Sequence, residues 1–132
     1  MNEQKKRMAP GKEDVPYDIR ERTFLFGVRV IKWTRTLPND TGTQIVVRQL
    51  VRSATSIGAN VEEADGADTQ KDKVYKWILS RKEVRESRYW IRIILASDGE
   101  SDEGNALRQE SIELINILST LISKNKRSLD TG

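Results

Sequence analysis

The sequence predicts an all-α protein that folds as an antiparallel, up-down-up-down four-helix bundle. Signals for helix starts and stops recur along the chain, heptad spacing marks its two middle segments, and no segment shows the period-2 alternation of a strand. The length of 132 residues fits one domain. We expect a flexible N-terminal segment over residues 1–16, the bundle over residues 17–127 and a flexible tail over residues 128–132.

Capping residues and a proline bound the first two helices. Asp18 followed by Glu21 gives a capping-box-like start, and Pro38 closes the first helix. The second helix is expected to begin near Thr43 and to end at about Gly66, which suits a left-handed C-terminal cap.

The third and fourth helices have similar signals. Thr69 with Asp72 opens the third helix, which runs to about Ser97 and ends at residues 98–99. Ser101 caps the fourth helix, which ends in the basic run at residues 124–127.

Heptad spacing predicts that the second and third helices pack as neighbours. Positions separated by alternating steps of 3 and 4 residues carry Val47, Leu50, Ala54, Ile57, Val61 and Ala64 in one helix, and Trp77, Ser80, Val84, Ser87, Ile91 and Ile94 in the other. This spacing is typical of helices that cross at roughly 20°.

A second stripe of polar residues lies beside the first on the second helix, at Gln49, Ser53, Ser56, Asn60 and Glu63. These side chains either bond to one another inside the bundle or form a solvated face. The scarcity of long charged side chains between Ser53 and Val61 favours the interior.

The composition excludes much chemistry. The chain has no Cys and no His, so it has no thiolate nucleophile, no imidazole base and no thiolate or imidazole metal ligand. We therefore expect no enzyme activity, no metal site and no cofactor. No run of ~18 apolar residues suggests a membrane span, and no apolar run follows the basic first residues, so we expect a cytoplasmic protein.

Two motifs carry a resemblance to a known family. Residues 50–64, LVRSATSIGANVEEA, resemble the signature LRSGTSIGANVEEA, and residues 82–92, KEVRESRYWIR, resemble its partner KEARETRYWLR. Both signatures belong to bacterial four-helix bundle proteins related to those encoded in 23S ribosomal RNA intervening sequences. The motif residues are Arg52, Ser53, Ser56, Asn60, Glu62, Glu63, Glu83, Glu86, Tyr89 and Trp90.

The resemblance implies a short bundle that assembles as a homopentamer, without catalytic activity. The same superfamily includes the accessory variability protein of diversity-generating retroelements. For those members the resemblance further implies a positively charged outer surface that contacts reverse transcriptase and nucleic acid. This sequence departs from its relatives at the turn over residues 65–68 and at Ser80 and Arg81, which adds charge to the third helix.

The positive charge is concentrated in two of the helices. Residues 67–97 carry eight Lys and Arg against four Asp and Glu. At 100° per residue, four arginines of this segment fall within about 60° of one another. The candidate nucleic-acid-binding residues are Arg81, Lys82, Arg85, Arg88 and Arg92, together with Arg29, Lys32 and Arg35 of the first helix. Arg is well suited to grip phosphate oxygens.

Two alternatives remain open for these residues. Glu62, Glu63, Glu83 and Glu86 could pair with the arginines, within one subunit or between subunits, and remove them from binding. A buried network of Arg52, Asn60 and Glu83 between the second and third helices would hold the bundle together. 

The aromatic pair Tyr89 and Trp90 either stacks on bases or fills a core or interface, and packing is the commoner role. Five apolar residues of the third helix lie outside its heptad seam: Ile78, Leu79, Tyr89, Trp90 and Ile93. A monomer would expose them, so they indicate self-association.

The sequence thus favours a non-enzymatic, homo-oligomeric accessory or scaffold protein that binds RNA or DNA through an outer basic surface. The alternative is a structural or protein-partner module with no nucleic-acid binding.

Overall fold

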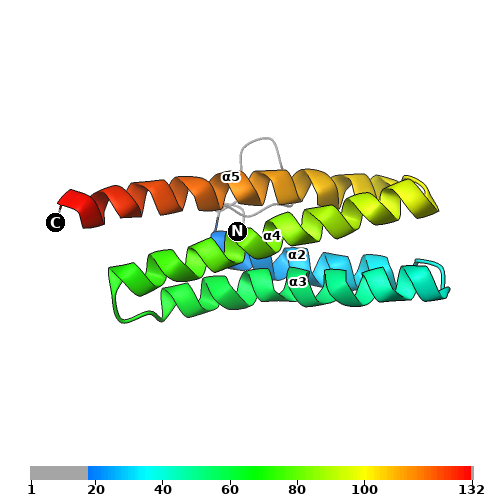
Figure 1. Ribbon diagram of the computed structural model, residues 1–132, viewed down its shortest axis with the longest axis horizontal. Helices are drawn as coiled ribbons and strands as arrows, with labels where there is room; N and C mark the ends of the chain where they lie inside the picture. Colours follow the sequence, from blue (N-terminus) through cyan, green and yellow to red (C-terminus); the bar gives the residue numbers. More distant parts are fainter. Residues whose placement is uncertain (1–17, 132) are drawn as a thin grey trace, which may run out of the picture.

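The computed structural model describes residues 18–131, which form four α-helices and no strand (Figure 1). The helices are α2 (Ile19–Thr34), α3 (Thr41–Asp65), α4 (Gln70–Asp98) and α5 (Asp102–Thr131). The segment at residues 1–16 that we expected to be flexible lies outside the described residues.

Each helix packs on its neighbours in the chain, and α5 also packs on α2. Within residues 18–131, no Cα atom of α2 lies within 8 Å of one in α4, and the same holds for α3 and α5, so these pairs lie on the diagonals of the bundle. This arrangement confirms the up-down-up-down four-helix bundle. With 16 residues, α2 is the shortest helix, and Figure 1 shows α5 extending past the turn between α3 and α4.

The helix caps follow the sequence signals at three of the four starts. Asp18 accepts a hydrogen bond from the Arg20 amide at 2.9 Å, and Thr69 accepts one from the Asp72 amide at 3.0 Å. The Ser101 hydroxyl accepts one from the amide of Gly104 at 3.1 Å. These contacts satisfy amide groups that have no partner within their own helix.

Two of the expected boundaries and one expected cap conformation differ from the structure. The second helix begins at Thr41, because Asp40 accepts hydrogen bonds from both the amide and the hydroxyl of Thr43, each at 2.9 Å. Gly66 has a φ of −90°, so it is not a left-handed cap. Within residues 18–131 a positive φ occurs instead at Gly99, where φ is 99°. The fourth helix continues to Thr131, four residues past the expected end of the bundle.

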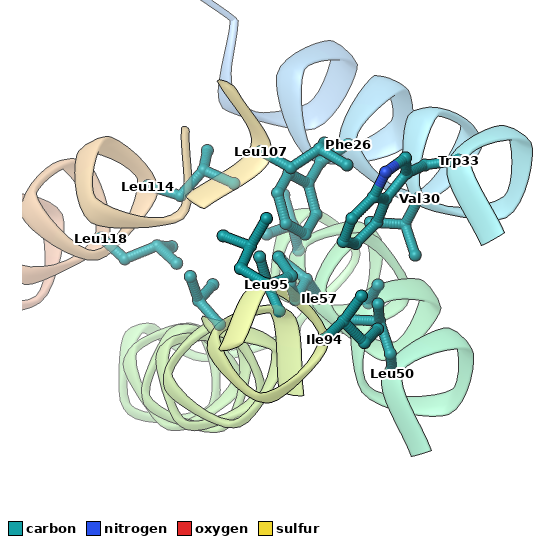
Figure 2. Close-up of a cluster of buried hydrophobic side chains, with 14 residues drawn as sticks. Phe26, Val30, Trp33, Leu50, Ile57, Ile94, Leu95, Leu107, Leu114 and Leu118 are labelled. Atoms are coloured by element: carbon teal, nitrogen blue, oxygen red, sulfur yellow. The ribbon is translucent and has the colours of Figure 1, made fainter. Parts of the chain in front are cut away.

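The core is built by all four helices (Figure 2). Phe26, Val30 and Trp33 of α2 point toward the same interior as Leu50 and Ile57 of α3. The heptad seam predicted for α3 is buried from Leu50 to Ala64, and that of α4 is buried from Ser80 to Ile94. The first positions of both seams, Val47 and Trp77, are half-buried.

Small hydroxyl residues line the seam between α3 and α4. Ser53, Ser80 and Ser87 are fully buried, and the Ser80 hydroxyl donates to the Ile57 carbonyl at 2.9 Å. Small side chains allow two helices to approach closely, and their hydroxyls find partners there. Of the second stripe, only Ser53 is fully buried; Ser56 and Asn60 are half-buried, and the end residues Gln49 and Glu63 are exposed.

Candidate nucleic-acid interface

Four arginines of α4 form one row beside α5, which we call the α4 arginine row: Arg81, Arg85, Arg88 and Arg92. From Arg81 to Arg92 an α-helix rises about 16 Å. Arg85 and Arg92 are exposed, whereas Arg81 and Arg88, one heptad apart on the same face, are half-buried. The Arg81 guanidinium donates to the hydroxyl of Ser119 on α5 at 3.1 Å, which places this face at the seam between the two helices.

The two half-buried arginines have unsatisfied donors. The Nε atoms of Arg81 and Arg88 are buried without a hydrogen-bond partner in the described part of the chain. A buried donor without an acceptor costs about 1–3 kcal/mol. Because these Nε atoms are closed to solvent, an external anion would have to reach the row through its other nitrogens, above all those of the exposed Arg85 and Arg92.

The acidic side chains near the α4 arginine row are bound elsewhere. Glu83 lies 3.5 Å from the guanidinium of Arg52 on α3, and Glu86 pairs with the same group. Glu62 pairs with Arg20 at 3.6 Å. Among the side chains that the structure describes, no carboxylate forms an ion pair with the α4 arginine row. The alternative that internal pairing removes these arginines is therefore not supported by the geometry.

Burial changes the electrostatics at Glu83. Loss of solvent around this carboxyl raises its pKa, and the neighbouring charge of Glu86 raises the pKa further, against the lowering effect of Arg52.

On α2, the carboxylates of Asp65 and Glu62 raise the pKa of the exposed Arg20.

The network expected at Arg52, Asn60 and Glu83 was wrong in two respects. Arg52 joins α3 to α4, but its side chain is 50% exposed, so the link is not buried. Asn60 takes no part, because its amide donates to the Ser56 carbonyl of its own helix at 2.9 Å.

The candidate residues of the first helix do not extend the α4 arginine row. Arg29 pairs with Glu103 of α5 at 3.0 Å, while Lys32 is exposed on α2 and Arg35 is exposed just after the end of that helix. Because α2 and α4 lie on a diagonal of the bundle, the structure holds these cations apart from the row. Lys82 is exposed on α4, one position after Arg81.

The two aromatic residues of the second motif have different environments. Trp90 is half-buried against the core, and its indole donates to Glu86 at 3.1 Å. Tyr89 is 53% exposed, with its ring in an edge-to-face contact 5.1 Å from that of Trp90. Packing is thus confirmed for Trp90, whereas most of the Tyr89 ring remains accessible.

Sequence reasoning missed two hollows in the surface. One, of about 280 Å³, lies between α2 and α3 and is lined by Phe24, Gly27, Val28 and Ile31 together with Ala54 and Gly58. The other, of about 360 Å³, lies beside the turn from α4 to α5 and is lined by Tyr89, Arg92, Ile93, Leu95, Ala96, Glu100 and Arg108. The apolar residues on the outer side of α2 were a sequence signal for the first hollow. The second hollow had no such signal, because Arg108 lies on the polar side of α5.

Two other kinds of feature are absent from the described part of the chain. No group of three or more Asp or Glu residues between residues 18 and 131 is placed to hold a metal ion. None of the helices described is both long and apolar enough to span a membrane.

The comparisons with known proteins agree with this architecture. A crystal structure from Bacteroides thetaiotaomicron VPI-5482, described as a protein of unknown function from the S23 ribosomal protein family, superposes with a TM-score of 0.73. It is 26% identical in sequence, and the match covers 80% of this chain and 98% of that one. No curated protein matches the sequence. Residues 16–120 match the family described as 23S rRNA-intervening sequence protein, and the chain belongs to that family.

Proposed function

We propose that this protein is a non-enzymatic accessory protein that binds RNA or DNA through the α4 arginine row and associates with further copies of itself. The observation that carries nucleic-acid binding is the row's freedom from carboxylate partners within residues 18–131, in a chain with 20 Asp and Glu. Four guanidinium groups along one straight helix can each engage a phosphate.

Salt dependence tests the binding. A subunit that contacts four phosphates should lose affinity roughly 50- to 150-fold between 50 and 200 mM salt, the lower figure for a single strand and the higher for duplex DNA. Fluorescence anisotropy with labelled RNA and DNA at several salt concentrations measures this slope. A complex whose affinity does not change with salt would rule out the row as a phosphate contact.

Matched variants locate the surface. Replacing Arg81, Arg85, Arg88 and Arg92 with Gln should abolish binding. The control replaces four exposed cations outside the candidate binding residues with Gln: Arg48, Lys71, Lys124 and Lys126. It has the same net charge and should keep most of the affinity. Equal losses in both variants would mean that net charge alone drives binding, and circular dichroism verifies that both remain folded.

Self-association is supported by apolar surface on opposite sides of the bundle. Phe24 on α2 is 60% exposed at the rim of the hollow between α2 and α3, and Tyr75 on α4 is 55% exposed. Because α2 and α4 lie on a diagonal, these patches cannot meet within one subunit. Contact between unlike faces of successive copies produces a closed ring when the rotation allows it, as in the pentamer that the resemblance implies.

Light scattering after size-exclusion chromatography tests the assembly. The wild-type protein should have a mass several times 15.1 kDa, and Phe24→Lys should reduce it to that of one chain. Ile45→Lys is the control, because Ile45 is 56% exposed and lies outside the hollow. A wild-type monomer at micromolar concentration would refute self-association.

The apolar hollow between α2 and α3 also favours the second candidate, a module that binds only proteins. A chain that assembles but binds neither RNA nor DNA at low salt would establish that function instead. A reverse transcriptase, implied by the resemblance to the retroelement proteins, stays a prediction for either candidate.

A further inference from the structure

The hollow beside the turn from α4 to α5 joins one end of the α4 arginine row. Arg92 belongs to both, and Arg108 reaches the same hollow from α5. Neither arginine has a carboxylate partner in the described residues. Two unpaired guanidinium groups from different helices therefore converge on one concave site.

The rest of the lining suits a nucleotide. The largely exposed ring of Tyr89 can stack on a base, and Ile93, Leu95 and Ala96 supply an apolar wall. The volume of about 360 Å³ lies within the range of small-ligand sites, ~300–1,000 Å³.

The charge along the helix changes sign just beyond this hollow. Glu100 lies in the lining of the hollow, and Asp98 and Asp102 flank it in sequence, so a polyanionic strand that continues past Arg92 meets repulsion at this turn. A strand that ends at Arg92 brings only its terminal phosphate near Glu100 and does not continue past Asp98 and Asp102. The turn therefore favours a strand end over a continuing backbone.

A terminal phosphate suits the two arginines better than an internal one. A phosphate monoester carries a charge of about −1.5 to −2 at neutral pH, and an internal phosphate diester carries about −1. Glu100 is the acidic residue that lines the hollow. Its carboxylate repels a second phosphate of the strand and can accept a hydrogen bond from the amino group of a base.

We propose that this hollow binds the phosphorylated terminal nucleotide of a strand held on the α4 arginine row, with the phosphate between Arg92 and Arg108 and the base on Tyr89. The proposal rests on the proposed nucleic-acid binding and adds to it a preference for phosphorylated strand ends. Arg108 is then a specificity residue outside the row.

Oligonucleotides of one sequence, with a 5′-phosphate, a 3′-phosphate or hydroxyls at both ends, test this preference in fluorescence anisotropy. One phosphorylated form should bind about tenfold more tightly than the hydroxyl form, because it gains charge-assisted hydrogen bonds. Arg108→Gln should abolish that difference and leave the affinity for the hydroxyl form nearly unchanged. Lys124→Gln, which removes an exposed charge of α5 outside the hollow, should preserve the difference.

The outcomes separate the two proposals. Equal affinity for all three strand forms in the wild-type protein, or an Arg108→Gln variant that keeps the preference, overturns end recognition and leaves binding along the row intact. If no strand binds, the proposed function fails. Calorimetric titration with a nucleoside monophosphate then decides on the hollow alone: binding that Arg108→Gln and Tyr89→Leu both weaken supports it, and an absence of binding overturns it.

Discussion

The hydroxyl oxygens of Ser53 and Ser87 lie 2.8 Å apart at the fully buried centre of the seam between α3 and α4. Ser53 also donates to the Leu50 carbonyl of its own helix at 3.1 Å, so Ser87 can donate to Ser53 while both side chains stay satisfied. The two motifs of the family thus meet through a pair of small residues.

Enlarging Ser87 should destabilise the bundle more than removing its hydroxyl. Ser87→Ala should lower the free energy of unfolding by about 0.5–1.5 kcal/mol, because Ser53 keeps its bond to the Leu50 carbonyl. Ser87→Leu should cost a further 1–3 kcal/mol or so, because the larger side chain forces the helices apart. Urea denaturation measures both; a leucine variant as stable as the alanine variant would show that the seam has room to spare.

A buried ion pair should dominate the contact between α2 and α5. Arg22 donates two hydrogen bonds to Glu110, at 2.6 and 2.8 Å, and one to Glu113 at 2.7 Å. The bonds to Glu110 raise the pKa of Arg22 despite its burial. Arg22→Ala should cost about 3–5 kcal/mol, because it leaves the Glu110 carboxylate buried without its partner.

The matched comparison is Arg29→Ala, which breaks the exposed pair with Glu103 and should cost less than about 1 kcal/mol. Thermal denaturation of both variants makes the test. Similar losses from the two substitutions would contradict the role of burial.

The stability of a Glu83 variant should depend on pH. Burial raises the pKa of Glu83 in the folded protein. The protonated carboxyl therefore makes its full contribution to the free energy of unfolding below the ordinary pKa of 4.5, and this contribution is lost as the pH rises through the raised pKa. Glu83→Gln removes the ionised carboxylate, while Arg52 keeps its pair with Glu86. The variant should be more stable than the wild type at pH 7, and the gap should narrow as the pH falls toward 4.5.

Melting temperatures measured across this pH range provide the check. Glu63→Gln, at an exposed position of α3, should show no comparable pH-dependent gain. A Glu83→Gln variant whose advantage stays constant with pH would refute the electrostatic cause.

Gly104 should not tolerate a methyl group. A Cβ at this position would lie 2.7 Å from Leu95 and 2.8 Å from the Trp33 ring, which is itself packed in the core. Gly104→Ala should therefore cost about 1–3 kcal/mol, although alanine is the better helix former. Gly42→Ala, whose nearest contact would be an ordinary 3.6 Å, should be neutral or stabilising by up to about 1 kcal/mol. Equal stability of the two alanine variants would contradict this packing.

The sequence by itself determined the helices and the faces they bury. Caps such as Asp18 and Thr69 act within one turn, and the heptad residues from Leu50 to Ala64 share a face because helical geometry is fixed. The start at Asp40 was missed because two threonines follow it and the choice among neighbouring caps depends on a single pair of hydrogen bonds.

Only the tertiary structure decided which charges remain available. A carboxylate can pair with an arginine four residues away on its own helix or with an arginine of a neighbouring helix. Here Glu83 and Glu86 of α4 both pair with Arg52 of α3. The same holds for Arg22 with Glu110, which lie 88 positions apart, and for the hollow that joins Arg92 to Arg108. Local spacing fixes the face on which a side chain lies, but ion pairs and hollows between helices depend on how those faces pack together.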